Sequence, residues 1–315
     1  MKTSLLKFLS LALFFAAFVF TSCEEDITDP DIVVIDDVFA PPPTANQQIE
    51  TAVLVEDYQN LFELKKRDGY RPVWIDGFQH RAGVSTDSYN TTMFNVIFEK
   101  ATEGQAWQAF HGLTGASYQA KFNELTADGY RLEFIESYVD NGAARYAPIF
   151  VKKSGPAYVA THGKPIANWQ AYFNDKVADG YRLVNRSVIM VNGNKYVTAL
   201  FDKKDVGSWV SKSNLTPGQT QTEMENNKQL GRPLSHMDIS QTNLTDDYTF
   251  GVIFNSEDHN NWYALNQLDQ TELDAEIAEA KSNGYTVTLV CAYDKFALIN
   301  GNEVHQIRYA VGFRK

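Results

Sequence analysis

The chain has 315 residues, of which 44% are hydrophobic and 21% are charged, and its formal net charge is -11. This is the composition of a globular protein and not of a disordered chain, and its length predicts about one to three domains. The acidic balance excludes a typical nucleic-acid-binding protein, because phosphate binding needs a cationic surface. Cys23 and Cys291 are the two cysteines, too few for a disulfide-rich scaffold.

The N-terminal segment combines Lys2 and Lys7 with an apolar run over residues 8–20. The run is shorter than the ~20 residues of a membrane-spanning helix and fits a signal peptide. Two small residues then precede Cys23, a pattern that resembles the bacterial lipobox, although Phe20 stands where an aliphatic residue is usual. The resemblance implies a signal peptide over residues 1–22 and lipid attachment at Cys23. An ordinary cleaved signal with an incidental cysteine is the alternative.

Residues 23–49 are expected to form an acidic tether, because residues 24–49 contain seven acids, no base and three consecutive prolines. Loss of the signal peptide changes the formal net charge from -11 to -13. Acids directly after the lipidated cysteine also resemble an export signal for the outer face of the outer membrane. A plain linker remains open. We expect an outer-membrane lipoprotein on the periplasmic or the exposed face, with Ile32–Ile35 as a short docking strand.

An internal repeat organises the rest of the chain. Gly-Tyr-Arg occurs three times and in two degraded forms, with glycines at Gly69, Gly129, Gly180, Gly231 and Gly284. An aromatic anchor lies 22 residues before each of the last four glycines, at Trp107, Tyr158, Trp209 and Trp262. The position 22 residues before Gly69 is Gln47, so the first unit lacks the anchor. Equal spacing over four copies indicates five tandem units.

Each unit predicts a helix followed by a hairpin. Apolar residues eleven and seven positions before each glycine lie on one helix face, and the glycine suits the left-handed position after a helix. Alternating residues after Gly129 predict a strand, and Asn-Gly pairs predict the hairpin turn. We therefore expect an α+β domain over residues 50–315. Its units are helix–strand–hairpin–strand with short linkers, over residues 50–106, 107–157, 158–208, 209–261 and 262–315.

Five units that cannot bury their apolar faces alone must stack on one another. They predict either a curved array or a closed, propeller-like ring, in which Ile32–Ile35 could complete the last sheet. The repeat motif, Trp107-x-x-x-His111-Gly112 followed by Gly129-Tyr130-Arg131, resembles a bacterial tandem repeat that also forms the N-terminal region of fungal polyglycine hydrolases. In those enzymes the catalytic serine lies in a separate β-lactamase-like domain. The resemblance therefore implies a secreted scaffold and no catalyst.

Catalytic motifs are sparse. Ser-x-x-Lys occurs once, inside the signal peptide, and neither Gly-x-Ser-x-Gly nor His-Glu-x-x-His is present. No cofactor or metal site is expected. His111 and His162 occupy equivalent positions where later units have Ser and Asn, which favours a turn or cap over metal ligation. Together with the arginines Arg71, Arg131 and Arg182, they are also candidates for a binding surface.

Two columns of residues are candidate sites. Arg71, Arg131 and Arg182 follow three repeat glycines and could line a groove for carboxylates or sugar hydroxyls, or could pair and stack within the fold. A second, polar column lies seven residues after each glycine and comprises Asp76, Glu136, Ser187, Asp238 and Cys291. In a closed ring it would converge, and carboxylates beside a thiol could form a reactive centre. A small buried thiol is the simpler interpretation of Cys291.

The sequence thus predicts a lipid-anchored repeat protein of the cell envelope that binds or scaffolds and does not catalyse. Its ligand would be a polymer, a peptide or a protein, and lipid on Cys23 would attach the protein to the membrane. The alternatives are a hydrolase with an unrecognised site and an accessory subunit of a separately encoded secreted serine hydrolase.

Overall fold

The computed structural model describes residues 46–82, 89–241, 248–257, 261–299 and 302–315. The predicted signal peptide, Cys23, Ile32–Ile35 and the predicted tether as far as residue 45 lie outside these residues, whereas residues 47–49 belong to the first strand of the domain. No helix within the described part of the chain is both long and apolar enough to cross a membrane.

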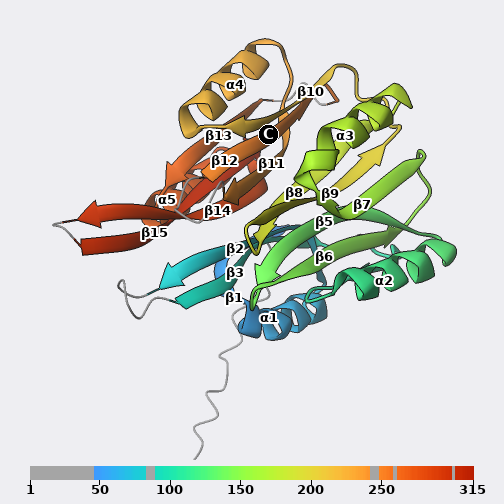
Figure 1. Ribbon diagram of the computed structural model, residues 1–315, viewed down its shortest axis with the longest axis horizontal. Coiled ribbons are helices and arrows are strands. Elements are labelled where there is room, and N and C mark those ends of the chain that lie inside the picture. Colours follow the sequence, from blue (N-terminus) through green and yellow to red (C-terminus); the bar gives the residue numbers. More distant parts are fainter. Residues whose placement is uncertain (1–45, 83–88, 242–247, 258–260, 300–301) are drawn as a thin grey trace, which may run out of the picture. The chain divides into compact units, whose positions relative to one another are not determined.

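Five successive repeats share one order of elements: a first strand, a helix, and two further strands. The first repeat has β1 (Gln47–Leu54), α1 (Val55–Arg67), β2 (Tyr70–Ala82) and β3 (Tyr89–Lys100). The second has β4 (Trp107–Ala109), α2 (Gly115–Ala127), β5 (Tyr130–Asp140) and β6 (Ala143–Lys152). The third has β7 (Tyr158–Pro165), the short η1 (Ile166–Asn168), α3 (Trp169–Ala178), β8 (Arg182–Val191) and β9 (Asn194–Asp202). The helices lie on the outside of the sheets (Figure 1).

The last two repeats keep the same order. The fourth has β10 (Trp209–Leu215), α4 (Pro217–Gln229), β11 (Leu234–Gln241) and β12 (Tyr248–Asn255). The fifth has β13 (Trp262–Leu268), α5 (Gln270–Ser282), β14 (Thr286–Ile299) and β15 (Asn302–Arg314). The tandem α+β repeat architecture predicted from the sequence is therefore confirmed.

Each repeat builds its own three-stranded antiparallel sheet, in which the last strand lies between the first and the second. The segment around the aromatic anchor, predicted to be a short linker, is thus a strand. The first repeat has this strand as well, although it begins with Gln47 and not with an aromatic residue, because the backbone of β1 pairs with β3 from Gln47↔Glu99 onward. The fifth sheet likewise draws its three strands from residues 262–314.

Two positions in every repeat have a left-handed backbone. The first is the glycine after the helix, where φ is between +64° and +81°, as predicted. The second lies five residues after the start of the first strand, and the sequence did not reveal it. Its occupants are Ala52, Gly112, Gly163, Asn214 and Gln267, with φ between +52° and +70°. In four of the repeats the strand register shifts around this residue, so it forms a β-bulge.

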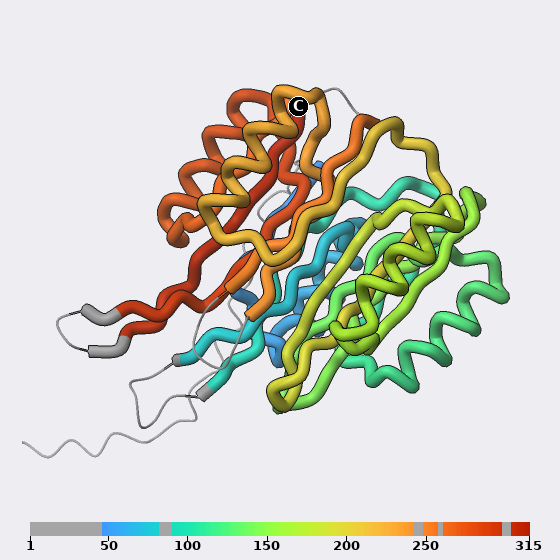
Figure 2. Tube along the Cα trace, turned by 45° about the horizontal axis from the view of Figure 1, so that its top comes forward, coloured from blue at the N-terminus to red at the C-terminus, as the bar shows by residue number. Residues whose placement is uncertain are grey.

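The repeats close into a ring through the strand that follows each helix. We call β2, β5, β8, β11 and β14 the inner strands, because each contacts the inner strand of the next repeat. The fifth repeat contacts the first: Trp74 Nε1 donates to the carbonyl of Val290 at 2.8 Å, and the amide of Ala292 donates to Asp76 Oδ2 at 2.9 Å. Figures 1 and 2 show the red strands of the fifth repeat beside the blue and cyan strands of the first. Of the two predicted arrangements, these contacts select the ring.

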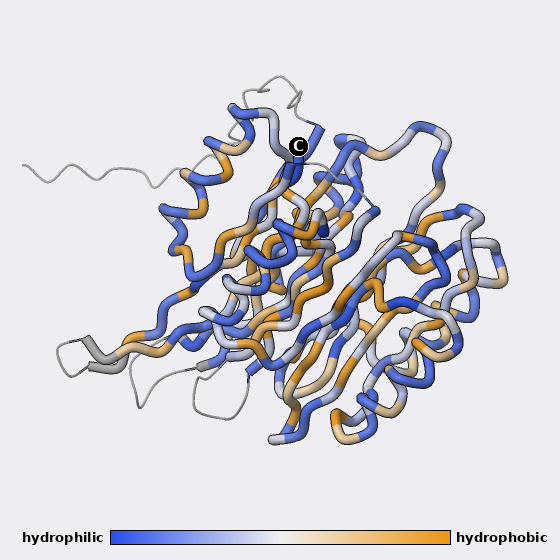
Figure 3. The backbone as a smooth tube through the Cα atoms, turned by 90° about the horizontal axis from the view of Figure 1, so that it is seen from above, coloured by the Kyte–Doolittle hydropathy of each residue, from blue (hydrophilic) through white to orange (hydrophobic). Residues whose placement is uncertain are grey.

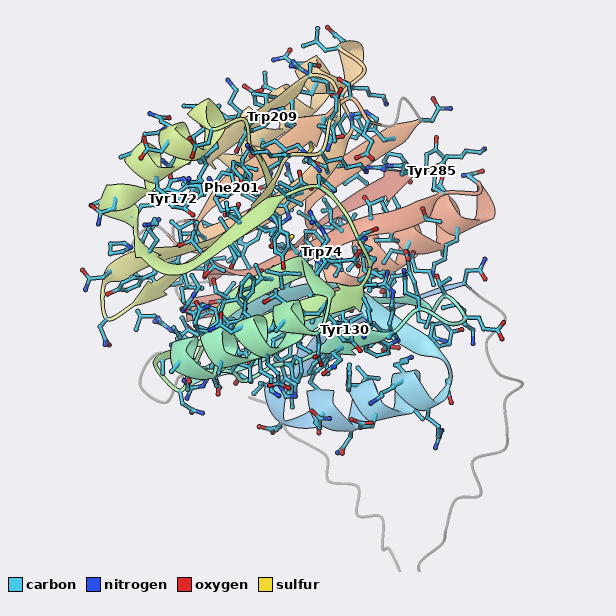
Figure 4. The ribbon with its side chains drawn as sticks, turned by 90° about the vertical axis from the view of Figure 1, so that its right-hand side faces the viewer. Trp74, Tyr130, Tyr172, Phe201, Trp209 and Tyr285 are labelled. Carbon is cyan, nitrogen blue, oxygen red and sulfur yellow. The ribbon has the colours of Figure 1, made fainter. Side chains whose placement is uncertain are left out.

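Side chains, and not a continuous sheet, join the repeats. The ring of Trp74 packs on Phe134 and His236, with centroids 5.0 and 5.2 Å apart, so residues of the first, second and fourth repeats meet around one indole. Figure 4 labels Trp74, which lies near the middle of that view. The Gln47 amide pairs in both directions with the backbone of Val287, at 2.8 and 3.0 Å. Figure 3 shows apolar residues gathered along the strands and polar residues on the outer helices. The core therefore lies between the sheets and beneath the helices.

Candidate functional site

The polar column converges inside the ring. Asp76, Glu136, Ser187, Asp238 and Cys291 lie on the five inner strands, and all five side chains are buried. The hydroxyl of Ser187 donates to Glu136 Oε1 at 3.0 Å, and Asn95 Nδ2 donates to Asp76 Oδ2 at 2.8 Å. The charges of Asp76, Glu136 and Asp238 all act on Cys291, so these four side chains lie near one another.

Burial dominates the electrostatics of this column. Removal from water raises the pKa of Asp76 to about 7, against the hydrogen bonds from Asn95 and Ala292 that lower it. Burial, followed by the charge of Asp76, raises the pKa of Glu136 well above its ordinary value. Asp238 forms an ion pair, because the Arg186 guanidinium lies 2.9 Å from its Oδ1. The column therefore combines two carboxyls of raised pKa with one ion pair.

Cys291 has the wrong environment for a nucleophile. Its side chain is fully buried, and its Sγ lies 3.4 Å from the carbonyl oxygen of Met237. Burial, and then the charges of Asp76, Glu136 and Asp238, raise the pKa of the thiol well above its ordinary value. A reactive cysteine needs a cationic, partly exposed setting that stabilises the thiolate. Within the described residues, no group of three or more His, Cys, Asp or Glu side chains is arranged to hold a metal ion.

The three arginines of the other column line one pocket where the inner strands begin. Arg71, Arg131 and Arg182 come from the first three repeats and border a cavity of about 420 Å³. Lys153 and Lys204 also line it, as do the acids Glu133 and Asp202. We call this the arginine pocket. Five cations against two acids make it locally positive on an acidic protein.

Partners within the fold hold all three arginines. Arg71 Nη1 lies 3.3 Å from Glu133 Oε2, and Arg182 Nε lies 2.9 Å from Asp202 Oδ1. Arg131 stacks on the ring of Tyr158, 4.4 Å from its centroid, and its Nη2 lies 3.8 Å from Asp202. These pairs and the stacking are the structural role that the sequence allowed. They also hold the guanidinium groups in fixed positions at the wall of the pocket.

The two histidines lie elsewhere and join neighbouring repeats. His111 Nε2 is 2.7 Å from Gln59 Oε1, and its ring meets Tyr58 edge-on at 4.9 Å. His162 meets Tyr118 edge-on at the same distance. Each therefore contacts the helix of the preceding repeat. Burial lowers the pKa of both imidazoles, so the neutral form predominates at pH 7 and above.

The lysines of the arginine pocket were missed at the sequence level. Lys153 lies directly after β6 and Lys204 lies two residues after β9. They are 51 residues apart, which is also the spacing of Gly129 and Gly180. That periodicity was a usable signal. Asp202 gave no such signal, because a lone acid at the end of a strand is usually solvated.

A comparison with protein families matches four of the five repeats. A family model described as "Polyglycine hydrolase-like, structural repeat" matches residues 55–101, 104–153, 155–204 and 259–299, which together exceed half of the chain. These ranges cover the first, second, third and fifth repeats. The match agrees with the resemblance carried by the Trp-x-x-x-His-Gly and Gly-Tyr-Arg motifs. The chain therefore belongs to the polyglycine hydrolase-like structural repeat family.

Proposed function

We propose that this protein is a non-catalytic binding module, held at the cell envelope by lipid on Cys23, whose arginine pocket takes a carboxylate-bearing ligand. The observation that carries the proposal is the convergence of Arg71, Arg131 and Arg182 on one cavity of about 420 Å³. Planar guanidinium groups bind carboxylates through paired hydrogen bonds, so three in one cavity favour an anionic ligand.

The partners of the arginines leave room for a ligand. The side chains of Arg71 and Glu133 are 16% and 22% exposed, so their ion pair lies at the surface of the pocket. Arg131 and Arg182 share a single carboxylate, that of Asp202. Lys153 and Lys204 are roughly half exposed and pair with Glu133 and Glu257, and exposed ion pairs of this kind are weak enough to exchange for a bound anion.

Separate observations support the absence of catalysis and the presence of a lipid anchor. The buried, protonated Cys291 thiol is a poor nucleophile, and the mature sequence carries none of the hydrolase motifs sought above. The lipobox-like sequence that ends at Cys23, followed by an acidic tether, supports attachment to a membrane.

The test uses the full-length protein purified in detergent, with tetragalacturonate as the carboxylate probe and the neutral galactose tetramer as its control. We expect saturable binding of the acidic probe that weakens as salt rises. The double variant Arg71→Gln/Arg131→Gln should bind it at least tenfold more weakly. Arg145→Gln, which lies on β6 outside the pocket, should bind normally.

Mass spectrometry of the released probe separates binding from catalysis. An intact tetramer supports a binding module. Shortened fragments would mean that the protein is an enzyme, and their loss in Cys291→Ala would locate its site. Equal binding of the acidic and neutral probes, or normal binding by the double arginine variant, would refute the proposed function of the pocket.

A further inference from the structure

A second cavity, of about 350 Å³, lies where the inner strands end, at the opposite end from the arginine pocket. All five repeats contribute to it through the position ten residues after the repeat glycine. These residues are Gln79, Val139, Met190, Gln241 and Asp294. The Asn-Gly turns of the second and third repeats complete the wall. We call this the hairpin-end pocket.

Amide side chains supply most of its polar groups. They belong to Gln79, Asn90, Asn141, Asn192 and Gln241. Each amide offers an acceptor oxygen and two donor hydrogens. In the part of the chain that the structure describes, neither Gln79 nor Gln241 uses its side-chain amide in a hydrogen bond with another residue. Both are half-buried, so these amides are available to a ligand at the wall of the cavity.

The pocket carries little net charge. Asp294 is the one acid among the lining residues, and two histidines engage it: His80 Nδ1 lies 2.7 Å from its Oδ1 and His305 Nδ1 lies 2.5 Å from its Oδ2. Its two oxygens are therefore already engaged. Arg81 is the one cation among the lining residues. This balance contrasts with the arginine pocket and favours an uncharged ligand.

An apolar strip lies among the amides. Val139, Met190 and Val191 line the cavity beside Tyr248, whose ring packs on Tyr293 at 5.1 Å. A pyranose ring has the matching two-sided chemistry, because its hydroxyls both donate and accept while its C–H face packs on apolar and aromatic groups. The volume lies within the ~300–1,000 Å³ range of small-molecule sites.

We propose that the hairpin-end pocket binds a neutral oligosaccharide, with Gln79 and Gln241 as its hydrogen-bonding residues. The inference is independent of the carboxylate-binding function, because the two pockets share no residue. A glycine-rich peptide, which also offers donors and acceptors, is the alternative occupant that the experiment must separate.

Calorimetric titration of the full-length protein in detergent tests the proposal. The probes are cellotetraose, mannotetraose and chitotetraose, with pentaglycine as the peptide probe. At least one tetrasaccharide should bind saturably and pentaglycine should not. The double variant Gln79→Ala/Gln241→Ala should weaken this binding about tenfold or more, as expected for loss of two hydrogen bonds. Gln119→Ala, on the exposed face of α2, is the matched control.

Two further measurements distinguish binding at this pocket from binding at the arginine pocket and from a loss of folding. Arg71→Gln/Arg131→Gln should leave saccharide binding unchanged. Should the double glutamine variant fail to fold, hydrogen exchange on the unaltered protein replaces it: bound saccharide should slow exchange in the turns at residues 140–143 and 191–194. Binding of none of the three saccharides, pentaglycine binding in their place, normal binding by the folded double variant, or unchanged exchange at these turns would overturn the proposal.

Discussion

Replacing Asp76 by Asn should stabilise the protein, and the gain in stability should grow as pH rises from 5 to 8. Burial raises the pKa of Asp76 from its ordinary 3.8 to about 7. Between these values the unfolded chain releases this proton while the folded chain keeps it, so stability falls as pH rises from about 4 to about 7. Three pKa units correspond to about 4 kcal/mol at most.

The asparagine amide reproduces the shape of the protonated acid. Its Oδ1 can accept the bonds that Asn95 and Ala292 now donate to Asp76 Oδ2. At pH 5 the variant should be more stable by about 1–2 kcal/mol, because the unfolded original protein has already released the Asp76 proton. At pH 8 the gain should be about 2–4 kcal/mol, because the variant removes the cost of a buried charge and the repulsion of that charge toward Asp238.

Urea unfolding followed by tryptophan fluorescence, at pH 5, 6, 7 and 8, measures this difference. Asp175→Asn, at an exposed position on α3, is the control and should leave the pH profile unchanged. Parallel loss of stability with pH in Asp76→Asn and the original protein would refute the argument. So would a variant that is less stable at pH 8.

Three further predictions concern the bulge, the ring and the anchor. Gln267→Gly should stabilise the protein by about 0.5–1 kcal/mol, because Gln267 is exposed and has a left-handed backbone with φ +65°. Gly112→Ala should destabilise the protein by about 1 kcal/mol, although an added Cβ meets no atom within 4 Å, because φ is +70° there. Urea titrations measure both changes. Opposite signs would contradict the backbone argument. Trp74→Phe should cost about 2–3 kcal/mol by leaving the buried Val290 carbonyl without its 2.8 Å donor, seen as a lower midpoint of thermal unfolding; an unchanged midpoint would mean that this bond does not hold the ring. Globomycin, which blocks lipoprotein signal cleavage, should make a precursor that contains Cys23 accumulate on immunoblots, and normal processing would exclude the anchor.

The repeat order was predictable because it depends on backbone conformation. The glycine after each helix has φ near +80° in four repeats, which few other residues tolerate, so the position is visible in the sequence. The bulge has the same left-handed backbone but is occupied by Ala52, two glycines, Asn214 and Gln267. A constraint met by four residue types leaves no readable motif.

Ring closure and the pockets depend on particular side chains and not on a periodic pattern. Gln47 stands where later repeats have an aromatic residue, and its contact with Val287 joins positions 240 residues apart. The sequence alone aligned Arg71, Arg131 and Arg182 in one column. The structure was needed to show that Lys153 and Lys204 line the same cavity. The convergence of the polar column followed from closure, whereas its raised pKa values came from burial.

The seam at Gln47 has a consequence for how the protein matures. The strand that completes the first sheet is made early, and its glutamine can bond Glu99 of the same repeat, but its pairing with Val287 must wait for the last repeat. Contacts of such separation slow folding, so each newly made chain passes through a state with an open end. An extra or missing repeat would break this seam, so the ring requires five repeats. An open solenoid has no such requirement. The first and last strands of the domain meet at this seam, because Gln47 of β1 and the end of β15 both flank β14. A circular permutation that joins these ends and opens the chain at residues 203–208 should therefore retain the ring.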